Sequence, residues 1–159
     1  MKITHNKRET IARVEAEYRA LERTVRRLGA KGLEAAIPGF GARARKRRER
    51  WKRKDSLAHI VYWKEHSLRT LRRALGEKLP FDTEMRGLTV DAQNRVLYLR
   101  WRDRTARDVV AYHRKVQRDL RKAMRALPPA YYAKRFSVLW PYDLAGHSTW
   151  HREHHLDNE

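Results

Sequence analysis

The chain has 159 residues, so we expect one domain over residues 1–159, and its 41% apolar content excludes wholesale disorder. No apolar run approaches the roughly 20 residues that span a bilayer, cysteine is absent, and the opening MKITHNKRET lacks a secretory signal, which together predict a cytoplasmic protein without disulfides or a membrane partner. The net charge of +19, from 38 basic and 19 acidic residues, favours a polyanion partner such as nucleic acid, or an acidic substrate.

The first helix is predicted from about Lys7 to Leu28. Its apolar residues recur at steps of 3 and 4, the pattern of a helix packed lengthwise against others, and they are Ile11, Val14, Tyr18, Leu21, Val25 and Leu28. Glycines and prolines over residues 29–41 then indicate a loop. Nine basic residues lie between Arg43 and Lys54. They form either a solvated loop or a phosphate contact through Arg45, Arg47, Arg48 and Arg50.

The second helix is predicted from Lys54 or Asp55 to Gly76, and it has two chemically different faces. The aliphatic face consists of Leu57, Ile60, Val61, Leu68, Leu71 and Leu75. The other face carries aromatic and polar residues, namely His59, Trp63, His66 and Thr70, with Tyr62 beside them. An ordinary surface helix presents lysine and glutamate opposite its core stripe, so we expect the second face to line a more polar interior.

Two further long helices complete the predicted fold, with a short helix from about Val90 to Trp101 before them. Thr105 and Asp108 have the spacing of a helix-capping box, and Pro128-Pro129 ends the helix that they open. His113 borders the apolar stripe of this helix and is expected to be a hydrogen-bonded core residue. Pro141 is expected in the first turn of the last helix. Strand signals are weak, so we predict an all-α fold, an antiparallel up-down four-helix bundle with a long basic loop between helices 1 and 2.

Four histidines lie within the closing stretch GHSTWHREHH, residues 146–155. His147, His151 and His155 recur every fourth residue on one helix face, with His154 at its shoulder. His151 and His155 can therefore present two imidazoles to one ion, as in zinc sites. His59, on the polar face of the second helix, is the candidate third ligand. The alternative is a polar tail rich in imidazole, and no H-E-x-x-H motif indicates zincin chemistry.

These patterns together resemble a known family. WKRKDSLAHIVYWKEH, residues 51–66, resembles the W-x-x-K-D-x-L-A-H-x-x-x-W signature of the DinB/YfiT-like superfamily, in particular its ClbS/DfsB branch. Residues 90–128 are similar to the branch's N-x-x-x-Y-x-x-x-R-x-R segment and the helix after it, and LAGHSTWHREHH is similar to its closing N-T-x-x-H-Y-x-E-H motif. The resemblance covers nearly the whole chain. It implies a four-helix bundle with a divalent metal, zinc or nickel, held by His59, His151 and His155.

Three functions are compatible with these observations. The first is a metal-dependent enzyme of the hydrolase or thiol-transferase type that acts on a small-molecule substrate, with no catalytic residue assigned. Its pocket is expected to be lined by Tyr62, Trp63, His66, His147 and Trp150, with His66 or His147 as a proton carrier. His147 stands where the branch usually has asparagine, so it is either a fourth ligand or a pocket wall.

The second function is a ClbS-like self-protection protein that shields DNA by non-specific binding or inactivates a genotoxic small molecule. The branch member that has this role lacks the histidine set, so this sequence matches the fold of the branch better than that chemistry. The third is an inert or oligomerising bundle. A monomer or a homodimer is expected.

Overall fold

The computed structural model describes residues 6–38, 50–133 and 144–158. Within these ranges the fold is all-helical, as predicted, and extended pairing is limited to one antiparallel bridge between Ala36 and Lys52. No helix in the described ranges is long and apolar enough to cross a membrane. The elements are α1 (Lys7–Leu33), α2 (Arg53–Ala74), the 3-10 turn η1 (Thr83–Met85), α3 (Val90–Trp101), α4 (Ala106–Ala126), α5 (Pro129–Tyr132), α6 (Leu144–His151) and the π-helical segment η2 (Arg152–Leu156).

Helix α1 extends further than its periodicity predicts. Its amino end is capped by Asn6, whose side-chain oxygen accepts hydrogen bonds from the backbone N–H groups of Arg8 and Glu9 at 2.8 and 3.4 Å. The helix is interrupted at Gly29, where φ is 61°, a conformation that glycine adopts at little cost, and then continues to Leu33. The prediction that a loop begins at Gly29 is therefore wrong, because this glycine kinks the helix and a further turn follows it.

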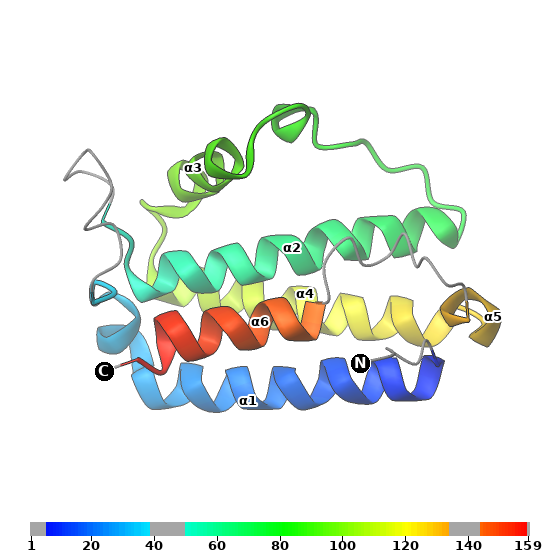
Figure 1. Ribbon diagram of the computed structural model, residues 1–159, viewed down its shortest axis with the longest axis horizontal. Coiled ribbons are helices and arrows are strands. Elements are labelled where there is room, and N and C mark those ends of the chain that lie inside the picture. Colours follow the sequence, from blue (N-terminus) through cyan, green and yellow to red (C-terminus); the bar gives the residue numbers. More distant parts are fainter. Residues whose placement is uncertain (1–5, 39–49, 134–143, 159) are drawn as a thin grey trace.

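Four helices, α1, α2, α4 and α6, lie side by side along the long axis of the molecule (Figure 1). Helices α1 and α4 are antiparallel, because Glu15 pairs with Arg121 near one end and Glu22 pairs with Arg114 further along. Helices α2 and α6 are also antiparallel. Ser56 near the start of α2 contacts His155, which follows the end of α6.

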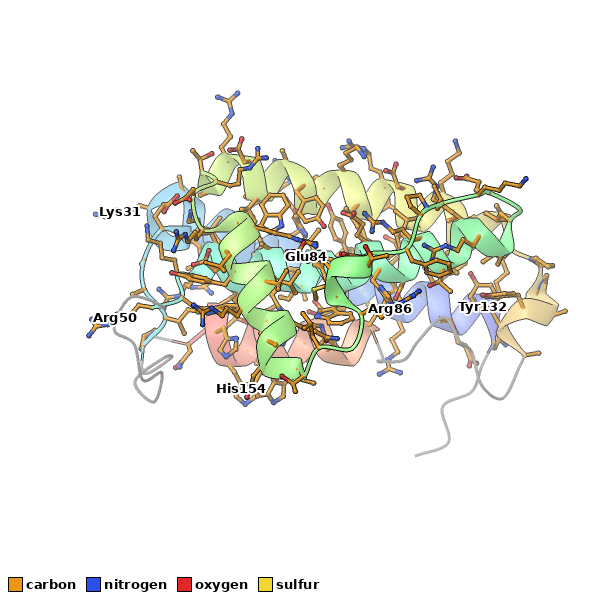
Figure 2. All side chains as sticks on the ribbon, turned by 90° about the horizontal axis from the view of Figure 1, so that it is seen from above. Lys31, Arg50, Glu84, Arg86, Tyr132 and His154 are labelled. Carbon is orange, nitrogen blue, oxygen red and sulfur yellow. The ribbon has the colours of Figure 1, made fainter. Side chains whose placement is uncertain are left out.

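Helices α2 and α4 run in the same direction, whereas the predicted up-down bundle has consecutive long helices antiparallel. The Nζ atom of Lys54, in the first turn of α2, donates hydrogen bonds to the carbonyl oxygens of Arg102 and Arg104, so α2 and α4 begin at the same end. Residues 75–105, which connect α2 to α4 and contain η1 and α3, run back over α2 (Figure 1 and Figure 2). Because this connection returns the chain to the end at which α2 begins, α4 runs parallel to α2 and not antiparallel to it. The predicted basic loop lies largely outside the described residues, over residues 39–49.

The hydrophobic core is formed mainly by the inward faces of α1, α2 and α4. The predicted aliphatic face of α2 is buried in it, except that Leu75 at the end of the helix is 41% exposed. Burial of each such side chain contributes about 1.5–3 kcal/mol. The core therefore fixes α2 so that its second face lies against α3 and α6. The buried face consists of Leu57, Ile60, Val61, Leu68 and Leu71.

Helix α4 begins at the predicted capping box. Thr105 Oγ1 accepts a hydrogen bond from the backbone N–H of Asp108, and the Asp108 side chain accepts one from the backbone N–H of Thr105. The helix ends at Ala126, before the two prolines. His113 is buried, with its Nε2 atom 3.0 Å from the carboxylate of Glu22, which confirms a hydrogen-bonded core histidine. The predicted helix start at Pro141 lies outside the described residues.

Candidate metal centre

Three histidines from two helices converge where α2 faces α6. His59 of α2 and His147 and His151 of α6 each offer one ring nitrogen, and these nitrogens all lie within 4.8 Å of one another. The ring centroids are 4.6 Å apart for His59 and His151, and 5.2 Å apart for His59 and His147. Three imidazoles are also the protein ligands of one class of catalytic zinc site, in which the fourth position stays open. The three histidines are therefore close enough to bind one metal ion.

The position of His59 is set by the start of α2 and by two indole rings. The Asp55 carboxylate accepts a hydrogen bond from the backbone N–H of Lys52 at 2.8 Å and so fixes the first turn of the helix. Trp51 and Trp63 approach the His59 ring edge-on, at centroid distances of 5.9 and 6.5 Å. His59 Nδ1 is buried and has no hydrogen-bond partner among the residues that the structure describes. Such a nitrogen costs about 1–3 kcal/mol, and a metal ion bound to it would remove that cost.

A buried carboxylate on α1 fixes the position of α6. Glu17 is 8% exposed and accepts hydrogen bonds from Ser148 Oγ at 3.0 Å and Thr149 Oγ1 at 2.8 Å. It also accepts two from Arg152, at 2.9 Å from Nε and 3.0 Å from Nη2, a bidentate pair of the strong kind. These donors lie within one helical turn of His147 and His151. The contacts to Glu17 therefore fix which side of α6 faces α2.

His155, which was predicted as a ligand, lies at the edge of the converging group. Its Nδ1 atom is 3.0 Å from Nδ1 of His151 and 3.0 Å from Oγ of Ser56. The predicted set of His59, His151 and His155 thus shares two members with the group whose nitrogens converge. The third member of that group is His147, which was predicted as a fourth ligand or a pocket wall.

The local helix geometry accounts for this difference. Spacing every fourth residue assumes an α-helix, but residues from Arg152 to Leu156 form a π-helical turn, which has more residues per turn and rotates His155 relative to His151. His154 is exposed at the surface (Figure 2). It donates a hydrogen bond to the carbonyl of Trp150 at 2.8 Å and stacks on the Trp150 ring. It therefore points away from the group, as its predicted shoulder position implies.

The histidines of this region are held in the neutral form. Burial, followed by the imidazoles of His147 and His155, lowers the pKa of His59 from its ordinary value of 6.5 to about 3. Burial, followed by His59, lowers the pKa of His151 to about 2. Burial also lowers the pKa values of His147 and His155, each to about 4. Since a metal ion binds the neutral imidazole, protons do not compete for these nitrogens at neutral pH.

The residues predicted to line a substrate pocket divide into two groups. Trp63 and Trp150 contact the histidines; Trp150 lies edge-on to His151 at a centroid distance of 4.9 Å and is 51% exposed. Tyr62 and His66 lie beside Trp63, with ring centroids 5.3 and 5.5 Å from its own. Aromatic rings therefore surround the histidine group on the side of α2 and on the side of α6.

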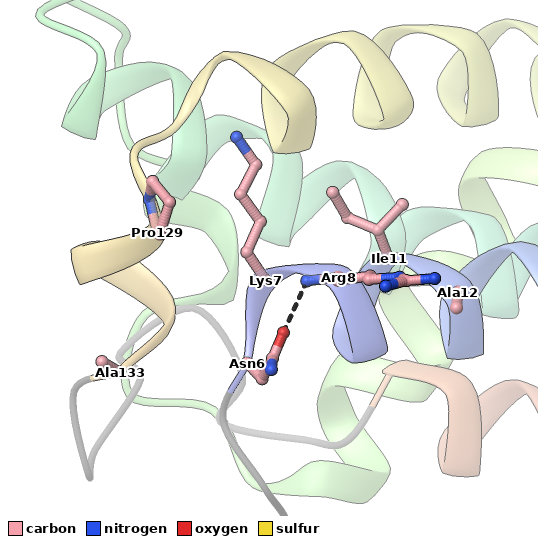
Figure 3. A pocket seen from close by; sticks show the side chains of 7 residues that line it. All are labelled: Asn6, Lys7, Arg8, Ile11, Ala12, Pro129 and Ala133. Carbon is pink, nitrogen blue, oxygen red and sulfur yellow. Dashed lines mark hydrogen bonds between the residues drawn. The ribbon is translucent and has the colours of Figure 1, made fainter.

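The phosphate contact predicted for the basic loop is described at only one of its residues. Arg50 is exposed (Figure 2), whereas Arg45, Arg47 and Arg48 lie outside the described residues. A hollow of about 670 Å³ lies away from the histidines, between the amino end of α1 and α5 (Figure 3). Its described lining contains neither histidine nor carboxylate, so it offers no comparable set of metal donors.

Two residues that support the site were not identified from the sequence, Glu17 and Ser56. Glu17 follows Val14 by three residues and precedes Leu21 by four, so an acidic residue lies on the apolar seam of the first helix. Ser56 precedes His59 by three residues and therefore shares its helix face. Each of these spacings indicates a polar side chain that faces the interior of the fold.

Comparison of the chain with family models, curated proteins and solved structures finds no match. Over the described ranges, the fold and the site define an all-helical domain with three converging, neutral histidines. What this site does must therefore be argued from its chemistry.

Proposed function

We propose that the protein is a metal-dependent enzyme of the DinB/YfiT-like superfamily that holds a divalent ion through His59, His147 and His151. The observation that carries the proposal is the convergence of three ring nitrogens within 4.8 Å. The buried, unpartnered Nδ1 atom of His59 fits this donor set. Imidazole ligands suit zinc and nickel. A bound divalent ion supplies Lewis acidity that polarises a substrate.

His155 and Ser56 orient the ring of His151. When Nδ1 of His151 carries a proton, it donates to Nδ1 of His155, and Nε2 of His151 is then the nitrogen left for the ion. Ser56 contacts the same nitrogen of His155 and restrains that ring. Outer contacts of this kind set the tautomer and the orientation of a metal ligand. We therefore assign His155 a supporting role, which the variants below distinguish from the ligand role that the family resemblance implies.

The aromatic rings define what the site accepts. The indoles of Trp51, Trp63 and Trp150 form apolar walls around the histidines, which favours a substrate with a flat or apolar part. His66, beside Trp63, is the candidate proton carrier. Burial, followed by the charges of Arg73 and Arg69, lowers the pKa of its imidazole below the ordinary value, so the neutral ring is available to accept a proton. Hydrolysis and thiol transfer both fit a site of this composition.

The proposed family membership is supported by the structural tasks of the residues in its signature. The Trp51 ring stacks on Tyr98 of α3 at a centroid distance of 5.6 Å. Lys54 donates to the backbone that precedes α4, and Asp55 fixes the first turn of α2. His59 belongs to the converging group. These contacts, together with the lengthwise packing of four helices, support the proposed four-helix bundle of the superfamily.

The proposal is tested by titrating zinc into metal-free, untagged protein in a calorimeter. We expect one ion per chain, and a loss of affinity of at least about a hundredfold when His59, His147 or His151 is replaced by alanine, since changes in outer contacts alone typically cost 10–100-fold. His154→Ala is the matched control and should bind as the wild type does. His155→Ala should fall between these limits.

The relative effects of His147 and His155 decide between the two ligand sets. If His155→Ala is as severe as His151→Ala while His147→Ala is neutral, the set implied by the resemblance is correct. If all of these variants bind zinc as tightly as the wild type, the histidines are not a metal site and the proposed function fails with it.

A further inference from the structure

A second cavity, here called the arginine pocket, lies between α2, α3 and the start of α4. Its volume is about 340 Å³, close to the lower end of the roughly 300–1,000 Å³ of small-molecule sites. No histidine of the described residues lines it, so it is separate from the candidate metal centre. Its lining consists of Tyr62, Glu65, Arg69, Arg100, Trp101, Arg104 and Tyr112.

The acidic groups at this pocket are already engaged. Asp82 accepts hydrogen bonds from both terminal nitrogens of Arg100, at 2.9 and 3.1 Å, and one from the hydroxyl of Tyr62 at 2.9 Å. Glu65 accepts one from Arg69 at 2.9 Å. These contacts hold the arginines in position. Arg100 is also paired with Glu84 at 2.5 Å, so of the three arginines in the described lining only Arg104 has no carboxylate partner among the described residues.

Arg104 carries the charge that no carboxylate neutralises. Its guanidinium makes no ion pair with any residue in the described parts of the chain, and it lies over the ring of Trp101 at 5.9 Å from the centroid. Trp101 in turn stacks on Tyr112, with centroids 4.4 Å apart and planes inclined by 17°. The pocket thus combines an unpaired planar cation with a stacked pair of aromatic rings.

We infer that the arginine pocket binds a small organic acid with a flat ring, its carboxylate or phosphate on Arg104 and its ring against Trp101. The planar guanidinium donates paired hydrogen bonds that match both of these acids. An aromatic ligand ring gains by packing against an aromatic side chain. A cavity of this size accommodates a compact ligand. The inference does not rest on the proposed metal site, because the two sites share no lining histidine.

The test uses isothermal titration of the full-length protein with benzoate, phenyl phosphate and the uncharged benzamide at fixed ionic strength. We expect at least one of the two acids to bind and benzamide not to bind. Arg104→Gln should weaken binding of that acid at least tenfold, as the loss of a charge-assisted hydrogen bond implies. Arg107→Gln is the matched control, since Arg107 is an exposed arginine of α4 outside the lining, and it should change binding less than twofold.

The outcomes separate a built site from general attraction to a basic protein. Tighter binding of benzoate identifies a carboxylate ligand, and tighter binding of phenyl phosphate identifies a phosphate ligand. The inference is overturned if neither acid binds at millimolar concentration, if benzamide binds equally well, or if both glutamine variants weaken binding equally. Should Arg104→Gln lose helical circular dichroism, Arg104→Lys replaces it. That variant keeps the charge without the planar fork, and unchanged binding by it also overturns the inference.

Discussion

The contact between Glu17 and Arg152 allows a stability prediction with a definite size. In the pair the Glu17 side chain is 8% exposed and that of Arg152 is 16% exposed, and Glu17→Ala would leave the guanidinium without its bidentate partner. Removing one member of a buried pair typically costs about 3–5 kcal/mol. Arg152 keeps a second partner, Asp157, at 2.9 Å, so we expect the lower value, about 3 kcal/mol. For a domain of this size that loss lowers the melting temperature by about 6–12 °C.

The assay is thermal and urea unfolding of the metal-free protein at pH 7, followed by far-ultraviolet circular dichroism. Glu153→Ala is the control, because Glu153 lies 4.0 Å from the same arginine but is 58% exposed, and it should change the free energy of unfolding by about 0.5 kcal/mol or less. If Glu17→Ala melts within about 2 °C of the wild type, the carboxylate does not hold α6 in place. The explanation given for the position of His147 and His151 would then be wrong.

The remaining predictions concern protons and polyanions. Folding lowers the pKa values of the buried histidines below 6.5, so the unfolded chain binds more protons between pH 6.5 and about 4. As the pH is lowered through that window, the free energy of unfolding of the metal-free protein should therefore decrease, by up to about 1.4 kcal/mol per pH unit for each histidine. Equal free energies of unfolding in urea at pH 7 and pH 5 would contradict this. DNA contact, the alternative function, predicts sequence-independent binding that weakens steeply with salt and less steeply once the basic loop is neutralised. If a mobility-shift assay at low salt shows no protein–DNA complex, the DNA-binding function is rejected. The residues to neutralise are Arg45, Arg47, Arg48 and Arg50.

Much of the fold could be predicted because the apolar pattern of a helix reports which of its faces is buried. The two faces of α2 are chemically distinct in the sequence, and the structure places the aliphatic one in the core and His59 of the other against α6. Local signals were equally direct, since Thr105 and Asp108 form the predicted capping box. Such features depend on neighbours within one or two helical turns.

The features that were not predicted depend on contacts between distant parts of the chain or on local departures from ideal helix geometry. Nothing near Lys54 in the sequence indicates that it anchors the backbone before α4, which makes α2 and α4 run in the same direction. The π-helical turn at Arg152 places His147 rather than His155 among the converging nitrogens, and a four-residue spacing does not reveal it. The role of Glu17 depends on its pairing with Arg152, 135 residues away.

The central claim is that His59, His147 and His151 hold one metal ion, and anomalous X-ray scattering from crystals of zinc-loaded protein tests it most directly. The account predicts one strong peak at the zinc absorption edge between α2 and α6, about 2.0–2.1 Å from one ring nitrogen of each of the three histidines. His155 should lie outside this first set of ligands and contact His151. A peak bound by His155 in place of His147 would contradict the ligand assignment. Zinc found only on surface residues such as His154, or no peak in this region, would contradict the metal centre itself.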